Sequence, residues 1–160
     1  MATKTDGTLW AWGANTNGAL GQNDRTNRSS PVQIPGTNWK PLIGRGHSSF
    51  HTDPVGATKT DGTLWIWGAN NYGELGVNDV VYRSSPTQVP GTNWHTVSFG
   101  YNNTFASKTD GTLWVWGSNV NGQLGLNQAV SISYSSPVQV PGNWSRNTII
   151  TSKMSSFGIK

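Results

Sequence analysis

Two histidines and an aspartate lie close together within residues 40–59. His47, His51 and Asp53 offer two imidazoles and a carboxylate, which are ligand types that divalent transition metals accept. Their spacing matches no closed zinc motif, and the Ser-Ser-Phe that precedes His51 occurs again at residues 155–157. We therefore expect an enlarged surface loop here, and a metal site with these three residues as candidate ligands is the alternative interpretation.

A second set of candidates is aromatic. Three single tryptophans each follow a Pro-Gly turn, which favours a place near the rim of a sheet, where a ring could stack on a sugar. The other tryptophans form Trp-x-Trp pairs, which we expect in the core because one large aromatic side chain buries about 150–250 Å² when packed. The candidate glycan-binding residues are Trp39, Trp94 and Trp144.

The sequence contains none of the common motifs of enzyme active sites. It contains no nucleophile elbow, phosphate-binding loop, zinc helix or dinucleotide fingerprint. Asp6, Asp61 and Asp110 each precede a glycine, a position where Asp serves the backbone of a turn. No cysteine is present, so disulfide and thiolate chemistry are unavailable. The sequence predicts neither an enzyme nor a cofactor.

The charge pattern argues against two classes of partner. The net charge of +4 comes from 11 Lys and Arg residues set singly among 7 acids, whereas proteins that bind nucleic acid cluster their positive charge. No run approaches the roughly 20 apolar residues needed to cross a bilayer, and no secretory signal is visible. We expect no nucleic-acid partner and no membrane association.

Any functional residue would be positioned by a unit that occurs three times. The segment TKTDGTLWAWG at residues 3–13 returns as TKTDGTLWIWG at 58–68 and as SKTDGTLWVWG at 107–117. A Ser-Ser-Pro and a single tryptophan follow each copy in the same order, which identifies a repeated structural unit. We predict one domain, 1–160, whose repeats span approximately 4–58, 59–107 and 108–160.

The apolar period within each unit is two. In GTLWVWG, Leu113 and Val115 point to one side and Trp114 and Trp116 to the other, as on a β-strand. Asp-Gly favours a hairpin before this strand, the proline-bounded SSPVQV favours a strand at a sheet edge, and residues 93–100 predict a further strand. Four short antiparallel strands in about fifty residues match one β-propeller blade. The chain is predicted to be all-β, with three blades and no helix.

The order of these elements resembles the regulator of chromosome condensation repeat. W-x-x-V-x-x-G at Trp94, Val97 and Gly100 precedes T-D-G-T-L-W-x-W-G, N-x-x-G-x-L-G and S-P-x-x-V. The resemblance covers essentially the whole chain and implies β-propeller blades. In the founding member a seven-bladed ring exchanges nucleotide on a small GTPase, an activity that a three-repeat chain disfavours. The tryptophan-rich interface of the family's plant ultraviolet receptors has no residue-by-residue match here.

An arc of three blades leaves two apolar blade faces uncovered. Soluble monomers rarely expose apolar patches beyond a few hundred Å². We therefore expect identical chains to associate head to tail, a contact that closes into a ring if the rotation allows. A dimer with a six-bladed ring is the expected form, and the alternative is that the chain is a fragment of a larger propeller.

These features predict a non-enzymatic interaction or assembly module whose partners are itself and other proteins. The surface is poor in charge and rich in Asn, Ser, Thr and Gly, which is typical of particle-surface proteins. One concrete form is a structural component of a phage or virus particle, such as a decoration or tail-associated protein, and the expected location is then the virion, otherwise the cytoplasm. Glycan binding is the alternative function, and guanine-nucleotide exchange is the disfavoured one.

Overall fold

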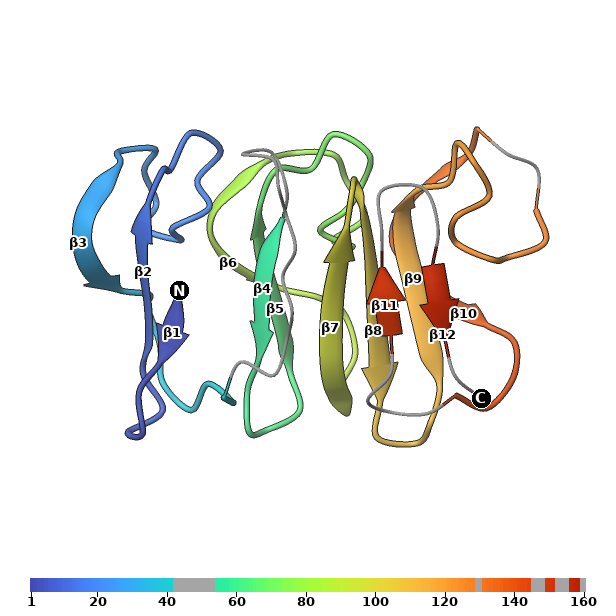
Figure 1. Cartoon of the computed structure of the whole chain (residues 1–160), viewed down its shortest axis with the longest axis horizontal. Coiled ribbons are helices and arrows are strands. Elements are labelled where there is room, and N and C mark those ends of the chain that lie inside the picture. The colour runs from blue at the N-terminus through green and yellow to red at the C-terminus, as the bar shows by residue number, and fades with distance from the viewer. Residues whose placement is uncertain (42–53, 129–130, 145–148, 152–155, 159–160) are drawn as a thin grey trace.

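The computed structural model describes residues 1–41, 54–128, 131–144, 149–151 and 156–158. The described residues form strands joined by turns and contain no helix (Figure 1). The strands belong to four antiparallel sheets, of which the first three stand side by side along the molecule. The prediction of an all-β chain built from propeller-type blades is confirmed.

We call the first three sheets blades 1, 2 and 3. Blade 1 contains β1 (Ala2–Thr3), β2 (Leu9–Gly13) and β3 (Arg28–Gln33), and blade 2 contains β4 (Val55–Thr58), β5 (Leu64–Gly68) and β6 (Arg83–Gln88). Blade 3 contains β7 (Trp94–Gly100), β8 (Asn103–Lys108), β9 (Leu113–Ser118) and β10 (Ser133–Val140). A two-stranded sheet, β11 (Ile149–Thr151) and β12 (Ser156–Gly158), follows, and β11 contacts β7.

The same set of hydrogen bonds closes every Asp-Gly hairpin. In blade 3, Asp110 Oδ1 accepts bonds from the Thr112 N–H at 2.9 Å and from the Thr112 hydroxyl at 2.7 Å. That hydroxyl accepts a bond from Trp114 Nε1 at 2.9 Å. Gly111 between them has φ +84°, a conformation that side chains disfavour. The turn therefore positions the first indole of the Trp-x-Trp pair, and blades 1 and 2 repeat the arrangement.

The proline-containing strands lie at the sheet edges, as predicted. In blade 3 the strand order is β10-β9-β8-β7, and β3 and β6 end their sheets in the same way. The pairing of β10 with β9 is interrupted between Tyr134 and Val138, which brackets Pro137. The missing proline N–H is therefore not needed in the ladder.

Blade 3 spans a predicted repeat boundary. Its strands β7 and β8 come mainly from residues 59–107, whereas β9 and β10 come from 108–160. The register Trp94↔Lys108 joins the two, and an isolated bridge between Trp39 and Lys59 marks the same point in blade 2. Blades 2 and 3 thus each combine segments of two successive repeats, so adjacent repeats are tied by backbone hydrogen bonds.

The core lies between the blades. Leu64 and Ile66 of β5 pack toward blade 3 against Trp116 and Ala106, whereas Trp67 of the same strand packs toward blade 1. These side chains are fully buried. Because neighbours cover both faces of blade 2, both sides of its central strand are apolar, as the alternating pattern predicted.

Candidate functional site

The predicted metal ligands cannot be placed. His47, His51 and Asp53 lie outside the described residues. Among the residues that the structure does describe, no three His, Cys, Asp or Glu side chains gather as a metal site would require. The expectation of a surface loop rather than a metal site at residues 47–53 stays a prediction.

Two of the three candidate glycan-binding tryptophans are buried rather than exposed on a rim. Trp39 and Trp94 are only 2% and 1% exposed, and Trp144 is half-buried. Trp39 packs edge-on against Trp67 with ring centroids 6.1 Å apart, and Trp94 makes the equivalent contact with Trp116 at 6.0 Å. Neither buried ring offers a free face to a sugar.

Lysines fill the space between these tryptophans and the first indole of the next pair. Lys59 Nζ lies 4.7 Å from the ring centroid of Trp39 and 4.6 Å from that of Trp65. Lys108 repeats this geometry between Trp94 and Trp114. An ammonium over an indole face is attracted by the negative electrostatic potential that the ring quadrupole creates there. The sequence showed these lysines at equivalent positions, but their contacts with two rings depend on the hairpin register.

A loop from blade 1 covers an indole of blade 2, and a loop from blade 2 covers an indole of blade 3. We call residues 15–23, 70–78 and 119–127 the blade loops. Trp67 Nε1 of blade 2 donates to the Ala19 carbonyl at 2.9 Å, and Trp116 Nε1 of blade 3 donates to the Glu74 carbonyl at 2.7 Å. A Cβ built at Gly76 would lie 2.7 Å from Trp116 Nε1, so a glycine is required where the indole meets the loop.

The blade loops also bond to the outer strand of the next blade. The Asn23 N–H donates to the Ser84 carbonyl, and the Asn78 N–H donates to the Ser135 carbonyl, both at 2.7 Å. Asn23 and Asn78 have φ of 60° and 65°, so both loops use the same left-handed turn. The two junctions between blades are therefore built from the same contacts.

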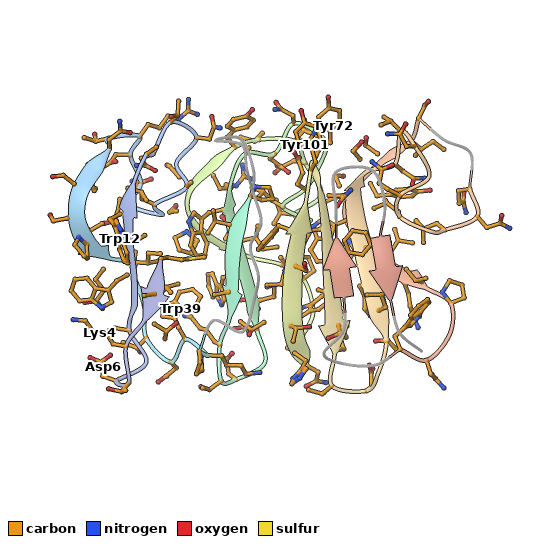
Figure 2. The ribbon with its side chains drawn as sticks, viewed as in Figure 1. Lys4, Asp6, Trp12, Trp39, Tyr72 and Tyr101 are labelled. Atoms are coloured by element: carbon orange, nitrogen blue, oxygen red, sulfur yellow. The ribbon has the colours of Figure 1, made fainter. Side chains whose placement is uncertain are left out.

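Trp12 of blade 1 differs from its counterparts. It is 47% exposed, whereas Trp67 and Trp116 at the equivalent positions of blades 2 and 3 are 0% exposed. Figure 2 shows Trp12 on the outer side of the first sheet, where no further sheet stands. We define the Trp12 face as the surface formed by the exposed residues of β2 and β3: Trp12, Gly13, Ser29, Ser30, Pro31 and Gln33.

The expectation that both tryptophans of every pair lie in the core is wrong for Trp12. The alternating pattern assigns the same environment to Trp12, Trp67 and Trp116, because it describes one strand at a time. The loops that cover Trp67 and Trp116 come from the preceding repeat, so the sequence of the strand itself carries no sign of the cover. The Trp12 face is the candidate functional site.

Comparison with protein families identifies the repeat. The model of the regulator of chromosome condensation (RCC1) repeat matches residues 6–52, 61–107 and 110–153. The chain belongs to the RCC1-repeat family. A second RCC1-repeat model matches residues 94–123.

Relatives of this RCC1-repeat chain are longer proteins. The ultraviolet-B receptor UVR8 of Arabidopsis thaliana is 32% identical over 172 residues, which cover 99% of this chain and 38% of the receptor. Human protein RCC2 is 33% identical over 86 residues, covering 53% of this chain and 16% of that protein. The chain thus spans well under half the length of these relatives.

Solved RCC1-type structures share the fold. Prp20p of Saccharomyces cerevisiae, studied for its binding to Gsp1p and histones, superposes with a TM-score of 0.73 at 18% identity. The superposition covers 99% of this chain and 41% of Prp20p. Human WBSCR16 superposes with a TM-score of 0.71 at 20% identity, over 94% of this chain and 39% of that structure.

Proposed function

We propose that this chain is a non-enzymatic RCC1-type interaction module that assembles with other proteins, including further copies of itself. The observation that carries the proposal is the exposure of Trp12 at a position whose two counterparts are fully buried. An indole is among the side chains most enriched where proteins meet. The Trp12 face is therefore a blade surface over which none of the described loops lies.

Two further observations support a binding role without catalysis. Asp6, Asp61 and Asp110 are engaged by threonines in the hairpin turns, so their carboxylates have structural partners. Prp20p, which shares the fold, binds Gsp1p and histones, and a further solved structure shows Kap60 bound to yeast RCC1. Protein recognition is thus a known use of this architecture.

The native mass of the purified chain tests the proposal. We expect light scattering at micromolar concentration to report a multiple of the 17.2 kDa chain mass. The Trp12 face of a monomer would stay open to water. A folded protein that remains at 17.2 kDa over the whole concentration range would contradict self-association.

As a more specific form of this function, we propose that the chain is a structural component of a phage or virus particle. The cytoplasm is the alternative location. Support comes from composition, because charged residues make up only 11% of the chain while Gly alone contributes 20 residues. No described helix is long and apolar enough to span a membrane. Mass spectrometry of purified particles tests this form, and absence of the chain from them would contradict it.

A further inference from the structure

Blade 3 carries a blade loop of its own, preformed in the conformation that covers an indole elsewhere. Asn119 Oδ1 accepts a bond from the Leu124 N–H at 3.0 Å, as Asn70 does from Leu75 at 2.9 Å. The φ of Gly125 is 66°, against 68° at both Gly21 and Gly76. The turn at Asn127 is left-handed, with φ 50°, as at its two counterparts.

This third loop covers nothing among the described residues. No described atom lies within 4 Å of a Cβ built at Gly125, whereas Cβ atoms at Gly21 and Gly76 would lie 3.1 and 2.7 Å from an indole nitrogen. Gly122 and Gly125 are exposed, whereas the equivalent glycines of the first two loops are buried. The loop following β9 therefore has the same conformation as the two loops that cover an indole, but no described indole lies beneath it.

The molecule thus presents both halves of one junction. In Figure 1 the loop after β9 lies at the opposite end of the row of blades from β2 and β3. The Trp12 face offers an indole without a cover, and the loop 119–127 is a cover without an indole. The two internal junctions show how such halves fit.

We propose that the Trp12 face of one copy receives the loop 119–127 of a second copy, head to tail. The inference rests on the proposed assembly function and specifies its surfaces. By the pattern of the internal junctions, Trp12 Nε1 donates to the Gln123 carbonyl of the second copy, and the N–H of that copy's Asn127 donates to the Ser29 carbonyl. Such a heterologous contact buries different surfaces on the two partners.

Two single variants each disable one half of the junction. Trp12→Ser removes the indole from the face. Gly125→Asn keeps the left-handed backbone, which Asn tolerates, and places a side chain where the indole must lie. The Trp12→Ser variant keeps an intact loop, and the Gly125→Asn variant keeps an intact face. An equal mixture can therefore form one junction, between the loop of the first variant and the face of the second.

We expect each variant alone to associate at least about tenfold more weakly than the natural sequence, as for a central interface tryptophan. The 1:1 mixture should recover a species of two chains by light scattering. Circular dichroism verifies that both variants are folded.

Two matched controls separate this junction from general effects. Tyr72→Ser removes another exposed aromatic ring, from a loop of blade 2 near the middle of the molecule (Figure 2). Gly111→Asn places Asn at another positive-φ glycine, in a hairpin turn, where a Cβ would lie 3.7 Å from the Trp144 carbonyl oxygen. Both controls should associate like the natural sequence.

The outcomes distinguish this inference from the proposed function. If the natural sequence is monomeric, both fail. If it associates but either single variant associates equally well, assembly stands and the proposed surfaces are wrong. If both variants are monomeric and their mixture stays monomeric even about 10⁴-fold above the concentration at which the natural sequence associates, the head-to-tail pairing is wrong.

Discussion

At the scale of single residues, three lysine side chains pack against indole rings. Lys59 and Lys108 each lie between two indoles, whereas Lys4 lies over Trp10 alone, at 3.9 Å from the ring centroid. Lys59 is half-buried and Lys4 is exposed. A cation held between two rings and shielded from water is attracted more strongly than one on an exposed ring.

We therefore predict that Lys59→Met lowers the free energy of unfolding by about 1–2 kcal/mol, and Lys4→Met by about 0.5 kcal/mol. Met retains a long apolar chain, so the comparison isolates the charge. Urea unfolding of both variants at one protein concentration measures the difference. Equal losses would show that the second ring contributes nothing.

The turn aspartates make stability depend on pH. The Thr112 hydroxyl, the largest influence, and the Thr112 N–H both donate to Asp110 and hold its pKa below the ordinary value. The same cause lowers the pKa of Asp6 and Asp61. A carboxyl whose pKa is lower in the folded state stabilises above its unfolded pKa, and this stabilisation is lost as the pH falls through the folded value.

We predict that the free energy of unfolding falls as the pH is lowered below about 4. Asp110→Asn keeps the turn, because Asn suits the same position, but removes one titrating group. Its free energy of unfolding should therefore fall less steeply with acid. Urea unfolding across the acid range compares the two, and identical slopes would contradict a role for Asp110.

At the scale of elements, the blade loop decides how closely two blades approach. Gly76 and Gly125 occupy equivalent positions with nearly equal φ, of 68° and 66°. A Cβ at Gly76 would lie 2.7 Å from Trp116 Nε1, whereas one at Gly125 meets no described atom within 4 Å. Substitutions at these two glycines therefore separate the free-energy cost of backbone strain from that of overpacking.

Gly76→Ala should destabilise by about 2–4 kcal/mol, the sum of positive-φ strain and overpacking. Gly125→Ala should cost about 1 kcal/mol, from strain alone. Measuring both by urea unfolding in a Trp12→Ser background removes the contribution of self-association. A cost at Gly125 as large as at Gly76 would contradict the packing argument.

Local features of the sequence predicted the elements well. The Asp-Gly hairpins, the strand alternation and the edge position of Pro137 follow from backbone preferences within a few residues, and the structure confirms them. Contacts between elements were not predictable in this way. Trp94 follows a turn, which suggested a rim, yet Lys108 and Trp116 from other strands bury it. Trp12 and Trp67 have the same local sequence pattern and differ only in whether a loop lies over them.

At the scale of the whole molecule, two opposite and complementary ends allow either a closed ring or an open filament. A head-to-tail pair that closes forms two junctions between the same two chains. The second junction then forms within one complex, at a high effective concentration, and strengthens the assembly by about 10²–10⁴-fold without any new kind of contact. A pair joined by one junction lacks this gain.

The mixture of Trp12→Ser and Gly125→Asn is such a single-junction pair. We therefore predict that the natural sequence dissociates at concentrations at least about 100-fold lower than this mixture, and that its mass stops rising at two chains. Sedimentation velocity over a dilution series measures both quantities. A mass that climbs continuously with concentration would indicate a filament, because a junction whose rotation does not close leaves a free face at one end and a free loop at the other, whatever the number of chains.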